Sequence, residues 1–183
     1  MLGSKKLSSL KKQGDIIFNS RFLKNLSSLE RYEFLQLCHR RNYKENEFIY
    51  YQGDPGTGMY FIEEGRVQLI IAPDADSDEE ERCFTLSSAE SFGALSIGYE
   101  LRRMSTAKCI TDCTLLGFFK PDFETLKKRH PLIAVKFMET LAMIAMKQLE
   151  ISNEALSKLS SKGEAHSLQF ETYYDPERED NAL

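Results

Sequence analysis

The spacing of apolar and polar residues changes twice along the chain, and each change predicts a different kind of secondary structure. Residues 27–41 place apolar side chains three and four positions apart, which is the period of an α-helix. Residues 46–120 carry short runs of aromatic and branched residues, and residues 120–160 return to the helical period. The pattern therefore predicts one helix, then a set of strands, then further helices.

The first predicted helix begins at an N-terminal capping signal. Ser27 and Glu30 have the spacing of a capping box, in which each side chain bonds the backbone of the other residue. The apolar residues that follow would form one face of the helix and cover one end of a sheet. This face is expected to consist of Leu29, Phe34, Leu37 and Cys38.

The runs between residues 46 and 120 are separated by glycine or acidic turns. Many short strands with such turns indicate a β-barrel or jelly roll, not alternating strands and helices. Glu64-Gly65 divides one long run into two, which predicts a hairpin. The predicted strands lie within residues 46–54, 59–71, 82–88, 105–110 and 113–120.

An acidic segment separates two of these strands. Asp74, Asp76 and Asp78 alternate as in a calcium-binding loop. That motif needs glycine at its sixth position and glutamate at its twelfth, where this chain has Glu79 and Thr85. We therefore expect a solvated acidic hairpin loop and no metal site.

The C-terminal half of the chain predicts a short and then a long helix. Pro121 suits the first turn of the short helix, and Pro131 follows its last turn. The long helix would span about 40 Å, more than one small barrel can cover. Its distal half is therefore expected to form a homodimer with a second chain; the alternative is an exposed amphipathic extension. The residues recurring at helical spacing are Met138, Leu141, Ala145, Leu149, Ser152, Leu156 and Leu159.

These elements predict mainly β structure with flanking α: a jelly-roll β-barrel with one N-terminal helix and two C-terminal helices. We divide the chain into an N-terminal arm (1–20), one domain that includes the long helix (21–160) and an acidic tail (161–183). With 42% hydrophobic residues, the 183-residue chain can bury a core.

The net charge of −4 gives no general attraction to nucleic acid or to an anionic membrane. No apolar run reaches the roughly 18 residues of a membrane span, and no signal peptide is recognised, so we expect a cytoplasmic protein without a membrane partner. The cysteines form no CxxC pair and are expected to be buried thiols, neither disulfides nor a metal site. They are Cys38, Cys83, Cys109 and Cys113.

Three motifs in this order resemble the cyclic-nucleotide-binding domain, a family that includes catabolite-activator-type transcription factors, kinase regulatory subunits and gated ion channels. "YYQGDPGTGMYFIEEGRVQLI" (50–70) is similar to its strand-turn-strand signature, and "FGALSIGYELRRMSTAKC" (92–109) to its phosphate-binding cassette. "LLGFFKPDFETLKKRHP" (115–131) is similar to the strand and helix that follow. The resemblance covers about residues 22–147.

The resemblance implies a phosphate site. A short helix would start near Gly93 and offer unpaired backbone N–H groups to an anion, and Gly93 would allow close approach. Arg103, not Arg102, falls on the family's phosphate arginine and would grip phosphate oxygens with its planar fork. The predicted ligand-binding residues are Gly93, Ala94, Leu95, Arg103, Ser105 and Thr106.

The cassette departs from the family at the position that contacts the sugar. Family members that bind a ligand carry a glutamate there for the ribose 2′-hydroxyl, and this chain has Ala94. Loss of that bond would cost about 1.5–3 kcal/mol of binding free energy. Glu90 lies four residues earlier and is not expected to reach, and Ala89 lies where the family usually has glycine. Gly98 also weakens the short helix.

Two hypotheses follow for the function. The first is a stand-alone regulatory module for signal transduction that binds cyclic AMP, cyclic GMP or a related small phosphate with weakened ribose recognition. The second is a degenerate member that binds no nucleotide and acts as a dimeric interaction scaffold, with Arg103 paired to Glu100 or Glu90. The sequence does not identify the protein partner.

DNA binding and catalysis are not expected. The residues after Ser160 are too few and too acidic for a helix-turn-helix domain, so we expect no nucleic-acid partner. His39, His130 and His166 have no evident nucleophile beside them, and no metal-ligand cluster or phosphate-binding Walker loop occurs. We therefore expect no catalytic residues and no cofactor.

Overall fold

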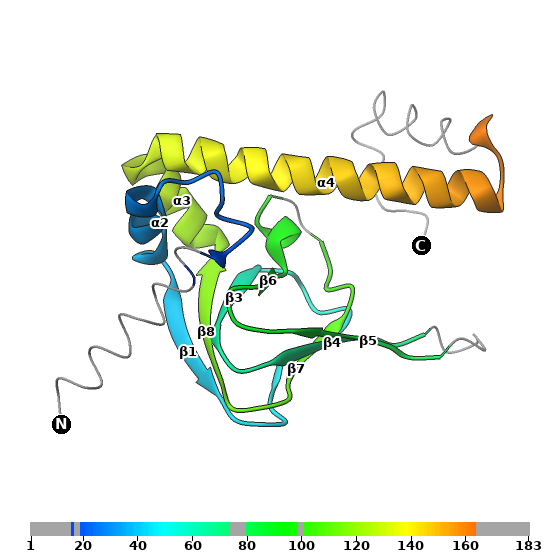
Figure 1. The fold of residues 1–183 in the computed structure, drawn as a ribbon, viewed down its shortest axis with the longest axis horizontal. Helices are drawn as coiled ribbons and strands as arrows, with labels where there is room; N and C mark the ends of the chain where they lie inside the picture. Colours follow the sequence, from blue (N-terminus) through cyan, green and yellow to red (C-terminus); the bar gives the residue numbers. More distant parts are fainter. Residues whose placement is uncertain (1–15, 17–18, 74–79, 99–100, 164–183) are drawn as a thin grey trace. The chain divides into compact units, whose positions relative to one another are not determined.

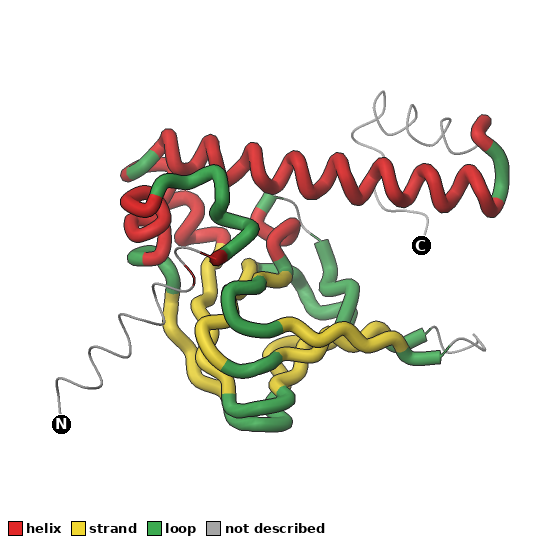
Figure 2. Tube along the Cα trace, viewed as in Figure 1, coloured by secondary structure: helices red, strands yellow, loops and turns green. Residues whose placement is uncertain are grey.

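The fold consists of two antiparallel sheets with helices before and after them (Figures 1 and 2). The computed structural model describes residue 16 and residues 19–73, 80–98 and 101–163. The chain divides into two compact units, Met1–Leu141 and Ala142–Leu183. Residues 74–79, the acidic segment whose spacing was compared with a calcium-binding loop, lie outside the described residues.

Each sheet has four strands, and neighbours in the sheet are mostly distant in sequence. The first sheet has the order β1 (His39–Tyr43), β8 (Cys113–Phe119), β3 (Gly58–Glu64), β6 (Ser91–Phe92). The second has the order β2 (Phe48–Tyr50), β7 (Thr106–Cys109), β4 (Val67–Ile71), β5 (Arg82–Leu86). This confirms the predicted fold class, a mainly β jelly roll with flanking helices.

The predicted hairpin at Glu64-Gly65 is wrong, because β3 and β4 belong to different sheets. Gly65 has a φ of 93°, and a Cβ there would overlap the Asp112 carbonyl oxygen. The Arg66 N–H donates to Thr111 Oγ1 over 2.9 Å. The turn is therefore held against the β7–β8 turn, and the chain passes from one sheet to the other.

The first helix, α2 (Ser28–Leu35), has the predicted capping box but ends earlier than predicted. The Ser27 N–H donates to Glu30 Oε2 over 2.8 Å, and the Glu30 N–H donates to Ser27 Oγ over 3.3 Å. His39 and the residues after it form β1 and pair with β8, so tertiary pairing overrides the helical period there. Leu29 is 70% exposed and is not part of the buried face, which is made by Phe34 and Leu35.

A cluster of phenylalanines joins the helices to the first sheet. The ring centroid of Phe34 lies 4.5 Å from that of Phe118 and 5.4 Å from that of Phe137. The ring centroids of Phe22 and Phe61 are 5.9 Å apart. Phe22 lies in the turn that precedes α2, and the other rings come from α2, β8, β3 and the start of the last helix, which lie together in Figure 1. Truncating one such buried ring to alanine typically costs about 3–5 kcal/mol.

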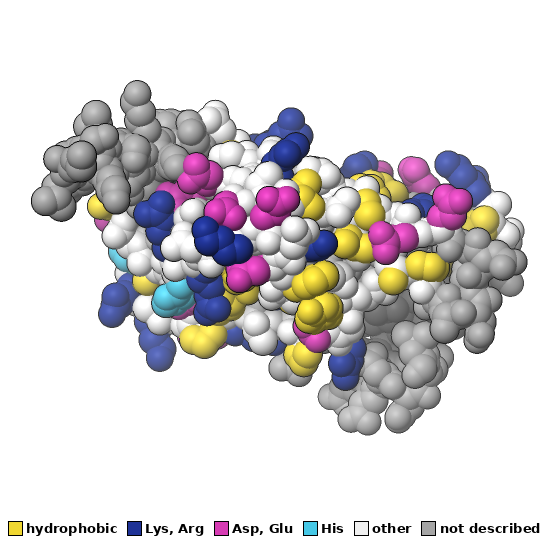
Figure 3. Space-filling view, turned by 90° about the horizontal axis from the view of Figure 1, so that it is seen from below, with side chains coloured by type: hydrophobic (Ala, Val, Ile, Leu, Met, Phe, Trp, Pro, Cys, Tyr) yellow, Lys and Arg dark blue, Asp and Glu magenta, His cyan; other side chains and the backbone are white. Residues whose placement is uncertain are grey.

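The short helix α3 (Lys120–Arg129) and the long helix α4 (Pro131–Leu159) are confirmed, with a proline in the first turn of α3. The buried residues of α4 all precede its distal half; they are Ile133, Ala134, Phe137, Thr140 and Leu141. No helix among the described residues is long and apolar enough to span a bilayer. Charged side chains of both signs are mixed with apolar ones on the face in Figure 3.

Candidate functional site

The segment that carries Arg103 is fixed by backbone pairing with the turn after β2. The Gly53 N–H donates to the Arg103 carbonyl and the Arg103 N–H to the Asp54 carbonyl, each over 2.8 Å. The Gly56 N–H donates to the Leu101 carbonyl over 2.9 Å. Two motifs about fifty positions apart in sequence are thereby held side by side.

The Arg103 side chain lies inside the protein and is only 6% exposed. Its Nη2 donates to the Gly58 carbonyl over 2.8 Å, and its Nη1 donates to Ser96 Oγ over 3.3 Å and to the Gly93 carbonyl over 3.5 Å. The guanidinium carbon lies 4.2 Å from the centre of the Tyr50 ring. Its Nε has no hydrogen-bond partner among the described residues.

This arginine carries a permanent charge in a buried position. Within the part of the chain that the structure describes, no carboxylate forms an ion pair with Arg103. Carbonyl dipoles and the Tyr50 ring compensate part of the cost of burial, but a buried charge is normally paired. Arg102, by contrast, is exposed and donates to the Gly53 carbonyl over 2.8 Å. Of the two arginines, Arg103 is therefore the buried one, and it has no ion-pair partner among the described residues.

Gly93 makes the close approach to Arg103 possible. Its φ is 76°, in the left-handed region, and it precedes a short 3₁₀-helix, η1 (Ala94–Ile97). A Cβ at this position would overlap Arg103 Nη1. Both the backbone conformation and the lack of space thus require glycine.

The remaining predicted residues take up different positions around this centre. Ala94 and Leu95 open η1 and are half-buried. Ser105 is half-buried near Tyr50, whose ring stacks on Arg103, and burial raises the pKa of Tyr50. Thr106 Oγ1 accepts from the Gln52 N–H over 3.0 Å, so its hydroxyl is committed to the β2 turn.

Three residues around the guanidinium were not predicted from the sequence: Tyr50, Gly58 and Ser96. Tyr50 and Gly58 lie in or beside strands of the 50–70 motif, and only the fold brings them to Arg103. Ser96 follows Gly93 by three positions within the cassette, so the motif itself contained a signal for it.

The residues before the cassette form a tight turn. Ala89 adopts a φ of 69°, a conformation that favours glycine. Glu90 Oε2 accepts from the Ser87 N–H over 2.7 Å and from Ser87 Oγ over 3.1 Å, so this carboxylate is committed to the turn. Glu100, the other acid considered as a partner of Arg103, lies outside the described residues.

The four cysteines are free thiols, as predicted, but only Cys109 and Cys113 are buried; the prediction of burial is wrong for Cys83, which is exposed, and Cys38 is half-buried. Burial raises the pKa of Cys38 far above its usual range, and burial beside Cys113 raises that of Cys109 to about 12. Protonated, buried thiols are poor nucleophiles and poor metal ligands. The described residues contain no group of three or more histidine, cysteine or acidic side chains that could hold a metal ion.

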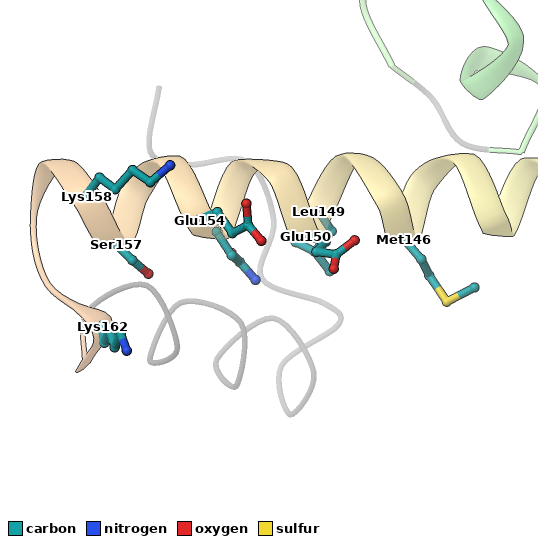
Figure 4. A pocket seen from close by; sticks show the side chains of 8 residues that line it. Met146, Leu149, Glu150, Glu154, Ser157, Lys158 and Lys162 are labelled. Atoms are coloured by element: carbon teal, nitrogen blue, oxygen red, sulfur yellow. The ribbon is translucent and has the colours of Figure 1, made fainter.

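A separate hollow lies along the distal part of α4, within the second compact unit (Figure 4). Its lining combines the apolar side chains of Met146 and Leu149 with charges of both signs, including Glu150, Glu154 and Lys158. A second lysine, Lys162, also lines it. Such a mixed lining is typical of a surface that packs against protein.

The fold is a jelly roll that holds a buried arginine beside a glycine turn. Residues 40–130 match the family model of the cyclic nucleotide-binding domain. This region of the chain therefore belongs to the cyclic nucleotide-binding domain family, which is regulatory in kind.

Individual relatives agree with this assignment. The chain is 31% identical over 126 residues to the cyclic AMP receptor protein of Thermus thermophilus, covering 69% of this chain and 56% of that protein. It is 32% identical over 136 residues to lysophospholipase NTE1 of Kluyveromyces lactis, covering 74% of this chain but 9% of the enzyme. The crystal structure of the Thermus thermophilus catabolite activator protein superposes with a TM-score of 0.66 at 30% identity, covering 77% of this chain and 63% of that one. The chain thus spans less than two thirds of the length of each of these three proteins.

Proposed function

We propose that this protein is a regulatory module that binds the phosphate of a cyclic nucleotide, cyclic AMP or cyclic GMP, at Arg103. The main support is the state of that side chain. A permanently charged guanidinium is buried beside Gly93, and one of its donors, Nε, has no partner among the described residues. A phosphate monoanion would supply the missing counter-charge and the missing acceptor.

The sugar half of the site is weakened. Ala94 stands where family members that bind a nucleotide carry an acid, and a methyl group accepts no hydrogen bond from the ribose 2′-hydroxyl. Glu90 does not replace it, because its carboxylate is already bonded to Ser87. The expected affinity is therefore lower than in members with the acid, and ribose and 2′-deoxyribose ligands should differ little.

Occupancy of the site would be transmitted to α4. A Cβ at Gly98, which ends η1, would lie 3.9 Å from Met138 Cε on α4, so the cassette and the helix are neighbours. A ligand that shifts η1 would change this contact and bias the position of the helix. The protein partner that reads this change would bind α4 or the segments flanking the domain.

Titration calorimetry with cyclic AMP and cyclic GMP at millimolar concentration tests the proposal. We expect heat of binding with the wild type and its loss in Arg103→Ala. Arg102→Ala is the matched control, because Arg102 is exposed and should leave the dissociation constant nearly unchanged. No heat with either nucleotide in the wild type would contradict the proposal.

A second test restores the acid. Ala94→Glu should tighten binding of cyclic AMP by about tenfold, which corresponds to about 1.4 kcal/mol, through a charge-assisted bond to the ribose. Ala94→Gln has the same shape without the charge and should gain less. A 2′-deoxy ligand should show no gain with Ala94→Glu; an equal gain would mean that the new carboxylate acts elsewhere.

A dimer through α4 is supported by the exposed apolar side chains of its distal half. Met146, Leu149 and Leu159 are exposed, and Leu149 and Leu159 belong to the set of residues that recur at helical spacing along α4. We propose that two copies pair along this part of α4. This interaction would also serve the scaffold function that the sequence leaves open, whether or not a nucleotide binds.

A further inference from the structure

Ser96 is a buried polar residue in the cassette whose side chain faces the Arg103 guanidinium. It is 5% exposed, and its Oγ accepts from Arg103 Nη1 over 3.3 Å. Ser96 lies in η1, three residues after Gly93, so the same short helix that opens the cassette carries this hydroxyl.

The protein leaves Ser96 little freedom to turn away. A Cβ at Gly56 would overlap Ser96 Oγ, so the hydroxyl lies directly against the Gly56 backbone. The Gly56 N–H in turn donates to the Leu101 carbonyl over 2.9 Å, which ties this wall to the segment that carries Arg103. Ser96 is thus enclosed between two backbone segments that are themselves hydrogen-bonded to each other.

The hydrogen-bond acceptors around Arg103 serve its two Nη atoms but not its Nε atom. Nη1 donates to Ser96 and Gly93, and Nη2 donates to Gly58, whereas Nε has no partner among the described residues. One face of the guanidinium is also covered by the Tyr50 ring. The edge that bears Nε is therefore the part of the fork that remains for an incoming oxygen.

We propose that Ser96 is a positioning residue for ligand binding: with the Gly58 carbonyl it fixes the Arg103 fork so that the Nε edge is presented to the phosphate. This inference rests on the proposed binding of a cyclic nucleotide at Arg103. A guanidinium that is already held in one orientation loses less conformational entropy when it binds an anion. The Ser96 hydroxyl would therefore raise the affinity for the ligand without contacting it.

Calorimetry with cyclic AMP on Ser96→Ala tests this role. The hydroxyl contributes one long hydrogen bond to a charged group, so its loss should weaken binding by about fivefold. Ser88→Ala is the matched control, because Ser88 Oγ donates to the Glu63 carbonyl and not to Arg103. Its dissociation constant should equal that of the wild type.

A double-mutant cycle separates positioning from a general structural effect. Lysine at position 103 has no Nε–Nη fork, so Ser96→Ala should have no further effect on affinity in an Arg103→Lys background. In the wild type, the ¹H–¹⁵N resonance of Arg103 Nε should shift on addition of cyclic AMP, and it is identified by its loss in Arg103→Lys.

The possible outcomes distinguish the two claims. If the wild type binds cyclic AMP and Ser96→Ala binds equally well, the role of Ser96 is refuted and the proposed function stands. An equal loss in both backgrounds, or an Nε resonance that does not move on binding, also refutes it. If the wild type binds neither cyclic AMP nor cyclic GMP, the proposed function fails and the role of Ser96 fails with it.

Discussion

At the scale of single residues, the site depends on two glycines as much as on the side chains that they leave room for. Gly93 leaves space for Arg103, and a Cβ at Gly56 would occupy the space of Ser96 Oγ. The sequence motif singled out Gly93 and Arg103, but only as groups that would each approach a phosphate. It predicted neither of these contacts, because both depend on how separate turns are folded against each other.

Ala89 is a further position where the residue type and the backbone conformation disagree. Its φ of 69° is unfavourable for a residue with a Cβ. Ala89→Gly should therefore raise the free energy of unfolding by about 0.5–1 kcal/mol, after allowance for the greater freedom of glycine in the unfolded chain. Chemical denaturation measures this, with Ala72→Gly as a control at an exposed alanine of ordinary φ. A stabilisation as large in Ala72→Gly, or a destabilised Ala89→Gly, would contradict the assigned strain.

At the scale of elements, local signals predicted where helices begin better than where they end or what strands pair with. The capping box of α2 and the proline of α3 are local chemistry and were predicted correctly. The end of α2 and the partners of β3 were not, because both depend on pairing with β8, which lies far along the chain. The Glu64-Gly65 turn is compatible both with a hairpin and with a connection between two sheets. The sequence alone favoured the hairpin.

The contact between α2 and α4 has a predictable dependence on pH. Lys136 Nζ lies 2.7 Å from Glu30 Oε1 and 2.8 Å from Oε2, and the Asn25 side chain donates to the Lys136 carbonyl over 2.6 Å. The bond from Lys136, with that from the Ser27 N–H, lowers the pKa of Glu30 from 4.5 to about 2. A lowered folded-state pKa means that this stabilisation is present above pH 4.5 and is lost as the pH falls toward about 2.

Glu30→Gln tests this link. The glutamine can still cap the helix but carries no charge, so the variant should unfold at lower denaturant concentration than the wild type from pH 5 to 7, by about 1 kcal/mol or less because both groups are partly exposed. The difference should shrink as the pH is lowered below 4.5. Glu33→Gln, whose carboxylate lies 3.9 Å from His130 Nε2, serves as a control. A difference between Glu30→Gln and wild type that is constant down to pH 2 would refute the assignment.

At the scale of the whole molecule, the two compact units have different bases of stability. The first encloses the phenylalanine cluster and the barrel core, whereas no residue of α4 beyond Leu141 is buried. The length and period of α4 could be predicted from its sequence, since both are local properties. Its proposed pairing with a second chain is a property of the assembly, and the sequence pattern left an exposed extension as the alternative.

The proposed dimer predicts a change in oligomeric state on substitution of one apolar residue. Leu149 is one of the residues that recur at helical spacing along α4, and Leu149→Glu should convert the dimer into a monomer in analytical ultracentrifugation, because two charges would face each other across the contact. Ile151 is also exposed but does not belong to that set of residues, so Ile151→Glu should leave the dimer intact. A wild type that sediments as a monomer at high concentration would refute the proposed pairing.

The most direct test of phosphate binding is a crystal structure of the protein soaked with cyclic AMP. We expect electron density for the cyclic phosphate within hydrogen-bond distance of Arg103 Nε, at the start of η1. Density for a protein carboxylate against that guanidinium, or a nucleotide bound only elsewhere, would show that the arginine does not serve as a phosphate receptor.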